Sequence, residues 1–204
     1  GMSAESGIST FRDAGGLWDK YPVEQVATPE GYARNPELVI NFYNERRKQL
    51  LDVVPNAGHL GVADLERDFN VTVVTQNVDN LHERAGSTHE LAPEEYEVKL
   101  GDKAGDGTQL RPFIVWFGES VPEIETAIRY VEQADIFVII GTSLNVYPAT
   151  GLLNYVPRAA EVYLIDPKPV DTHVMRPIHV IQKGASEGVK ELKALLTVTQ
   201  PPLP

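Results

Sequence analysis

The sequence contains no cysteine among its 204 residues. Disulfide bonds, thiolate catalysis and cysteine-bound zinc are therefore excluded for this chain. No apolar run approaches the roughly 20 residues that cross a membrane, and no signal peptide opens the chain, so we expect a cytoplasmic protein with no membrane partner. Basic residues are outnumbered: 18 Lys and Arg against 29 Asp and Glu give a formal net charge of -11, which disfavours binding to the phosphate backbone of nucleic acids.

The sequence does contain an alternation of short apolar runs with helical patterns. Five runs are typical of buried strands, at residues 71–74, 113–117, 136–140, 161–165 and 179–181. The spacing of apolar residues predicts helices at 37–53, 59–68, 123–133 and 185–196. Asn35-Pro36 is a suitable start for the first of these helices. The alternation indicates an α/β fold, with a Rossmann-like parallel sheet that carries helices on both faces.

Two segments depart from this alternation and predict a smaller, partly helical domain inserted into the larger one. Residues 16–56 look helical and irregular, and residues 85–111 are charged and glycine-containing, as in a surface excursion. The larger, nucleotide-binding domain would then consist of residues 1–15, 57–84 and 112–204. We expect the chain to be a monomer.

Polar residues gather where three of the predicted strands end. The clusters are Gln76-Asn77-Val78-Asp79, Gly141-Thr142-Ser143 and Asp166-Pro167-Lys168. Ligands of parallel sheets bind at the carboxyl ends of the strands, so we expect a nucleotide site there. The first two clusters also have a simpler interpretation, as a capped turn that starts a helix and as an ordinary strand-to-helix turn.

The chain opens with a loop of small residues, Gly1 to Gly7, followed by Phe11-Arg12. Small residues let the backbone approach a pyrophosphate closely, and a helix N-terminus would favour its charge. The alternative is a Gly/Ser loop with a surface arginine. The G-x-G-x-x-G fingerprint of nicotinamide-dependent dehydrogenases is absent, which disfavours hydride transfer.

Tyr43 and Arg46 lie three residues apart on a predicted helix, and therefore on one face of it. A hydroxyl and a guanidinium together can hold a carboxylate. The alternative is a solvated helix face that they share with Arg47 and Lys48. The five histidines, in contrast, show no spacing that resembles a metal site.

Taken together, these segments resemble the sirtuins, in the same order along nearly the whole chain. The matching motifs are GMSAESGI with Phe11-Arg12, Pro55-Asn56 with His59, TQNVDNLH at 75–82, Arg111-Pro112 with VWFGE at 115–119, and Gly141-Thr142-Ser143 with Val146-Tyr147-Pro148. The resemblance implies an NAD-dependent protein lysine deacylase, which transfers the acyl group of acyl-lysine proteins or peptides to ADP-ribose and releases nicotinamide. No metal is expected, because this chain has no cysteine ligands for zinc.

The resemblance also assigns residues to the cofactor NAD. The first loop would cradle it, Asn77 and Asp79 would be the catalytic candidates at the nicotinamide ribose, and the other strand ends would hold ribose, phosphate and adenosine. The implied cofactor-binding set is Gly1, Ser3, Ala4, Glu5, Phe11, Arg12, Gln76, Asn77, Val78, Asp79, Gly141, Thr142, Ser143, Asp166, Pro167, Lys168 and Ala185.

An acyl-lysine peptide would bind as an added strand between residues 115–119 and 143–147. The residues that the resemblance assigns to peptide binding are Val115, Phe117, Gly118, Glu119, Asn145 and Val146. In the sirtuin subgroup that acts on acidic acyl groups such as succinyl and malonyl, a Tyr-x-x-Arg pair binds the acyl carboxylate. Tyr43 and Arg46 match that pair.

Two departures from the family pattern bear on activity. The catalytic histidine of the family stands in a His-Gly pair after the Gln-Asn-x-Asp stretch, whereas this chain has no such pair, and Ser87-Thr88-His89 runs directly into Glu90. The first strand and the leading Gly-Ala of the nucleotide loop are missing too, which leads to the hypothesis that the sequence omits segments of a longer natural chain. Two alternatives therefore stay open: a non-catalytic NAD or ADP-ribose-binding module, and a protein mono-ADP-ribosyltransferase.

Overall fold

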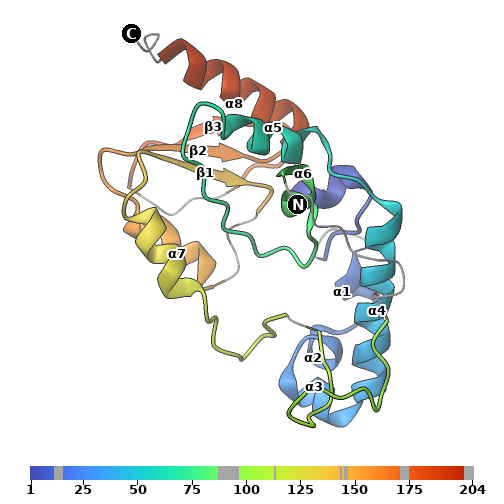
Figure 1. Ribbon diagram of the computed structural model, residues 1–204. Coiled ribbons are helices and arrows are strands. Elements are labelled where there is room, and N and C mark those ends of the chain that lie inside the picture. Colours follow the sequence, from blue (N-terminus) through green and yellow to red (C-terminus); the bar gives the residue numbers. More distant parts are fainter. Residues whose placement is uncertain are drawn as a thin grey trace.

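The computed structural model describes residues 1–11, 16–86, 97–112, 114–142, 144, 147–170 and 175–199. Its centre is a parallel sheet of three strands in the order β1 (Ile136–Ile140), β2 (Glu161–Ile165) and β3 (His179–Ile181). In register, Ile140 lies opposite Ile165, and Ile165 lies opposite Ile181, so the carboxyl ends of all three strands meet at one edge (Figure 1). The sequence predicted these three strands with these bounds.

Helices surround the sheet and form a second region beside it. They are η1 (Met2–Ser6, a 3-10 helix), α1 (Leu17–Lys20), α2 (Val23–Val26), α3 (Pro29–Arg34), α4 (Pro36–Asp52), α5 (Ala57–Leu65), α6 (Leu81–Gly86), α7 (Ile124–Val131), η3 (Ala149–Tyr155, a 3-10 helix) and α8 (Ala185–Thr199). None of the helices within the described ranges combines the length and apolar character of a membrane span.

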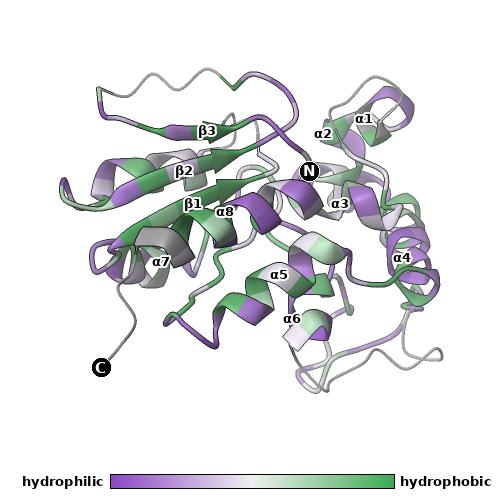
Figure 2. Ribbon diagram, turned by 90° about the horizontal axis from the view of Figure 1, so that it is seen from above, coloured by the Kyte–Doolittle hydropathy of each residue, from purple (hydrophilic) through white to green (hydrophobic). Residues whose placement is uncertain are grey.

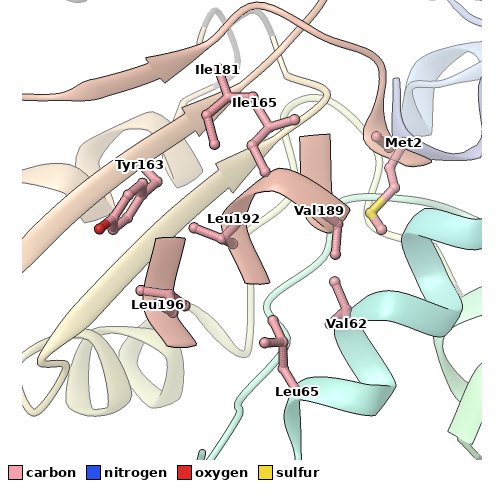
Figure 3. Packing of buried hydrophobic residues seen from close by; sticks show 10 residues of the cluster. Met2, Val62, Leu65, Tyr163, Ile165, Ile181, Val189, Leu192 and Leu196 are labelled. Carbon is pink, nitrogen blue, oxygen red and sulfur yellow. The ribbon is translucent and has the colours of Figure 1, made fainter. Parts of the chain in front are cut away.

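Alternate side chains of the sheet pack against helices on opposite faces. Val162 and Leu164 of β2 belong to a buried cluster with α7 and η3. Tyr163 and Ile165 belong to a second cluster, with α5 and α8 (Figure 3). Because the strand is apolar at successive positions and buried on both sides, the fold is α/β with helices on both faces, as predicted. In Figure 2, β1 is green along its length, in agreement with a buried strand.

Helices α1 to α4 form the helical region predicted for residues 16–56. Asn35 caps α4 by accepting a hydrogen bond from the backbone N–H of Leu38 at 3.1 Å, and Pro36 occupies the first turn. The core of this region is a buried cluster of Leu17, Val26, Ala27, Val39, Phe42, Tyr43 and Trp116. Figure 1 places α2, α3 and α4 away from the sheet. We propose that the chain divides into a large domain and a smaller domain inserted in two segments.

Two of the predicted strands are wrong. Residues 71–74 are not in a strand, and Val73 and Val74 are 42% and 48% exposed, because within the described residues no neighbouring strand pairs with them. Residues 114–117 are not a strand either, and Phe113 lies outside the described residues. Here Trp116 packs into the helical cluster, and the Phe117 N–H donates to the carbonyl of Ala27 at 3.0 Å.

We predict that the contact between α8 and the sheet carries a large share of the folding free energy. Leu192 on α8 is 1% exposed and packs in the cluster of Figure 3, so Leu192→Ala should lower the free energy of unfolding by about 2–5 kcal/mol. Leu195 on the same helix is 44% exposed, and Leu195→Ala should cost about 1 kcal/mol or less. Urea denaturation of both variants measures the difference, and equal losses would contradict this account of the core.

Candidate functional site

The first loop of the chain lies directly against the end of β1. The backbones at Gly1 and Gly141 are so close that neither position has room for a Cβ atom: one added at Gly1 would collide with Gly141, and one at Gly141 with Met2. Gly141 also has a positive φ of 62°, which favours glycine, and its N–H donates to the carbonyl of Ile165 at 2.9 Å. Two glycine-containing clusters that are 140 positions apart in the sequence therefore meet at the carboxyl edge of the sheet.

A buried polar network lies beneath η1. The Asn77 side-chain amide donates to Ser3 Oγ at 2.9 Å, and Ser3 Oγ lies 3.4 Å from His59 Nε2. His59 Nδ1 accepts from the Asn56 N–H at 3.3 Å, so the proton of the neutral ring is on Nε2 and points at Ser3. Since Ser3 Oγ then accepts two hydrogen bonds, its own hydroxyl hydrogen is left to donate to a ligand.

Burial sets the protonation state of His59. The side chain is fully buried, and desolvation, reinforced by the neighbouring His82 ring with its centroid 4.8 Å away, lowers the pKa of His59 to about 4. Burial lowers the pKa of His82 as well. Both rings are therefore neutral near pH 7. Histidine spacing could not indicate this pair, because the two residues lie on different helices, α5 and α6.

Asn56 joins η1 to the start of α5. Its Oδ1 accepts from the N–H groups of Gly58 and His59 at 2.9 and 3.2 Å, and caps the helix. Its Nδ2 donates to the Met2 carbonyl at 2.9 Å and to Ser6 Oγ at 3.1 Å. One side chain thus uses both its donor and its acceptor to fix the loop that carries Ser3.

A further part of the site lies at the ends of β2 and β3. The two carboxylate oxygens of Glu5 lie 3.2 and 3.4 Å from the Ser186 N–H in the first turn of α8, and Gly184 leaves the space that this carboxylate fills. Asp166 Oδ1 accepts from the Lys168 N–H at 2.8 Å, and closes the turn that contains Pro167. Ala185, the first residue of α8, is buried beside them.

Tyr43 and Arg46 line a small pocket between the helical region and the first loop. Phe11, Val78 and Asp79 are also in its wall, together with Ile8, Ser9, Leu17, Arg47, Gln49, Leu50 and Ile114. Arg46 Nε and Nη1 are buried and make no hydrogen bond within the described part of the chain. Asp79 also starts α6, because its Oδ1 accepts from the Leu81 N–H at 3.1 Å, so the turn interpretation of this cluster is confirmed while the side chain still reaches the pocket.

The remaining predicted residues are less closely joined to the site. Gln76, Val115, Phe117 and Gly118 are exposed. Thr142 Oγ1 accepts from the Leu144 N–H at 3.2 Å, and the Ala4 carbonyl accepts from the Gly7 N–H at 3.0 Å. Four of the predicted residues lie outside the described residues, namely Arg12, Ser143, Asn145 and Val146. Over the ranges that the structure describes, no three His, Asp or Glu side chains form a group that could hold a metal ion.

Glu119 has a structural role that the sequence did not indicate. It forms an ion pair with Arg111 at 2.7 Å, and its Oε2 accepts from the backbone N–H of Trp116 at 2.8 Å. The Arg111 guanidinium lies 3.8 Å from the centre of the Trp116 ring. Glu119 therefore holds the turn at 116–119 in place.

Comparison with known proteins places this geometry in a family. The model of the Sir2 family matches residues 1–93 and 90–148, as two pieces that overlap at residues 90–93. A relative from Bacteroides thetaiotaomicron, named NAD-dependent protein deacylase, is 76% identical over 220 residues, which cover 96% of this chain and 94% of the relative. Because that alignment is longer than this chain of 204 residues, the relative has residues in the aligned region that this chain lacks.

Solved structures agree. A Sir2 homologue in complex with NAD is 33% identical, with a TM-score of 0.82, and the match covers 97% of this chain and 86% of that chain. A mutant Sir2 homologue in complex with 2'-O-acetyl ADP-ribose is 32% identical, with a TM-score of 0.81, and the match covers 100% of this chain and 91% of that one.

We predict that the buried His59 makes folding sensitive to acid. Its pKa falls from an ordinary value of 6.5 to about 4 on folding, so between these pH values the unfolded chain binds a proton that the folded protein does not. The free energy of unfolding should therefore fall as the pH drops from 6.5 towards 4, by up to about 3 kcal/mol. His59→Gln should show a shallower fall in urea titrations across this range. At pH 8 the difference between the two proteins reports only packing and hydrogen bonding, and parallel pH curves would count against this assignment.

Proposed function

The chain belongs to the Sir2 family, and we propose that it is an NAD-dependent protein lysine deacylase. The observation that supports this most is the junction at the carboxyl edge of the sheet, where the Gly1 loop lies against Gly141 and the Asn77 amide is held by Ser3. This is where ligands of open α/β sheets bind. A relative with 76% identity carries the same activity in its name.

The residues at this edge fit a dinucleotide. The absence of side chains at Gly1 and Gly141 would let the backbone approach a pyrophosphate, and the Asp166 carboxylate would accept from ribose hydroxyls. NAD supplies the ribose carbon that receives the acyl group, with nicotinamide as the leaving group. The chain's own contribution is orientation: Asn77 is fixed by Ser3, and Ser3 keeps one hydroxyl hydrogen for a ligand.

An acyl-lysine peptide would add as a strand to residues 115–117. Val115 and Phe117 are exposed, and among the described residues the backbone of Val115 makes no hydrogen bond. The N–H groups of Trp116 and Phe117 already donate, to Glu119 and to Ala27, so a peptide would pair with the backbone of Val115, without regard to the peptide's side chains. The partners are therefore acyl-lysine proteins or peptides of varied sequence.

The preferred acyl groups are acidic ones, such as succinyl and malonyl. Burial raises the pKa of Tyr43 to about 12, so its hydroxyl stays protonated at neutral pH and can donate. Arg46 presents two buried N–H groups without partners in the described structure. An acyl carboxylate in the pocket would satisfy both side chains with charge-assisted hydrogen bonds.

A non-catalytic NAD or ADP-ribose-binding module is the second candidate, and one observation favours it. The 204 residues contain no His-Gly pair. His59 does not replace the missing base, because Nδ1 already accepts from Asn56 and Nε2 faces Ser3. Binding and chemistry must therefore be measured separately.

The test is turnover of matched succinyl-lysine and acetyl-lysine peptides by this chain with NAD, followed by mass spectrometry. We expect loss of the succinyl group together with nicotinamide and acylated ADP-ribose. Binding of NAD or ADP-ribose without turnover would replace the deacylase proposal with the binding module. A protein adduct of ADP-ribose would indicate mono-ADP-ribosyl transfer, and no binding of either nucleotide would overturn both proposals.

We predict that Arg46→Met weakens the interaction with succinyl-lysine peptide roughly 10- to 100-fold and leaves that with acetyl-lysine peptide nearly unchanged, because only the former has a carboxylate to lose. The ratio of kcat/KM values measures this in an active protein, and the ratio of Kd values in an inactive one. Lys48→Met, which removes a charge from an exposed position on the same helix, is the matched control. Equal losses on both peptides would refute the role of Arg46.

A further inference from the structure

The hydroxyl of Tyr43 has a fixed partner on the side of the helical cluster. Trp116 Nε1 donates to the Tyr43 oxygen at 3.1 Å, and both residues are buried. An indole N–H can only donate, so the Tyr43 oxygen must accept. The hydrogen of the Tyr43 hydroxyl is then left for another acceptor, and Tyr43 lines the pocket that it shares with Arg46.

The indole itself is held from several sides. The Arg111 guanidinium stacks on it at 3.8 Å, and Arg111 Nη1 and Nη2 donate to the two carboxylate oxygens of Glu119 at 2.7 and 3.0 Å. Glu119 in turn accepts from the backbone N–H of Trp116 at 2.8 Å. This closed set of contacts fixes the direction of the indole N–H, because neither the backbone nor the ring of Trp116 can shift without breaking one of them.

We propose that Trp116 is a positioning residue for acyl-chain specificity, which orients the Tyr43 hydroxyl so that it donates to the terminal carboxylate of an acidic acyl chain held by Arg46. The inference rests on the proposed function, and in particular on the carboxylate pocket. A donated hydrogen bond also polarises the hydroxyl that receives it, and makes that hydroxyl a stronger donor.

The position of Trp116 in the chain gives this contact a second consequence. Trp116 lies between Val115 and Phe117, the exposed residues to which a peptide would add, while its side chain reaches into the helical region to contact Tyr43. The segment that would bind the peptide backbone is therefore the one that orients a donor for the far end of the acyl chain. A peptide that shifts the 115–117 segment would change the selectivity between acidic and neutral acyl groups.

Trp116→Phe removes the N–H donor and keeps an aromatic ring. We expect the Kd for succinyl-lysine peptide, measured by isothermal titration calorimetry, to rise about three- to tenfold, while the Kd for acetyl-lysine peptide stays within about twofold. Tyr32→Phe is the matched control. Its ring lies 5.2 Å from that of Trp116, and its hydroxyl is buried without a partner in the described residues, so it disturbs the same cluster without removing a hydrogen bond of Tyr43. Neither Kd should change in this control.

Tyr43→Phe, alone and combined with Trp116→Phe, separates the possible outcomes. If Trp116 acts through Tyr43, its effect on succinyl-lysine binding disappears in the Tyr43→Phe background. An equal loss for both peptides, or a loss that persists in that background, overturns the inference. Selective loss in Tyr43→Phe with no effect of Trp116→Phe also overturns it and leaves the proposed function intact. If neither Tyr43→Phe nor Arg46→Met weakens succinyl-lysine binding selectively, the proposal of a carboxylate pocket is itself refuted.

If Trp116→Phe proves too unstable for calorimetry, Glu119→Gln provides the same test. The amide keeps the size of the side chain and removes the charge that holds Arg111 over the indole. We expect the Kd for succinyl-lysine peptide to rise about two- to threefold more than the Kd for acetyl-lysine peptide. An unchanged ratio of the two Kd values would count against the positioning role.

Discussion

The candidate site depends on the side chain of Asn56. Its carbonyl oxygen caps α5, and its amide holds the Met2 carbonyl and Ser6 Oγ. Buried backbone groups need partners, and η1 has no strand of its own to supply them within the described residues. The first loop is thus tied to a helix rather than to a sheet. Ser3 reaches Asn77 and His59 only because that tie is in place, and the glycine contact with the end of β1 follows from the same arrangement.

Local pattern predicted the strands correctly where the sheet supplies neighbours. The runs at 136–140, 161–165 and 179–181 became β1, β2 and β3, because each has a partner strand and contributes at least one residue to a buried cluster. The runs predicted at 71–74 and 113–117 carry the same local signal, yet residues 71–74 and 114–117 are not in a strand. A strand forms only where a neighbouring strand can pair with its backbone. Apolar residues without such a neighbour can pack in a helical core instead, as Trp116 does. Local periodicity alone does not show whether a run will pair in a sheet or pack in a helical core.

The same distinction separates the parts of the site that the sequence predicted from those it did not. Gly141 and Asp166 follow β1 and β2, so the order of the elements predicts that they meet at one edge of the parallel sheet. The cluster at 76–79 follows residues 71–74, which are not a strand, so this rule did not place it. Tyr43 and Arg46 share a helix face by spacing alone. The pairing of His59 with His82, and the contact of Trp116 with Tyr43, depend on tertiary packing between segments far apart in the sequence. Likewise, the lowered pKa of His59 follows from burial, which no spacing rule reports.

Recognition and chemistry are separable in this chain. The proposed acyl pocket would draw on α4 and Trp116, and the proposed nucleotide site on η1 and the ends of β1 and β2. The resemblance predicts the catalytic base in the stretch after α6, as part of a His-Gly pair. This sequence has no His-Gly pair there. Among the described residues, Nε and Nη1 of Arg46 are buried without a hydrogen-bond partner, which costs about 1–3 kcal/mol. A carboxylate that satisfies them would recover part of that cost as affinity, whether or not turnover follows.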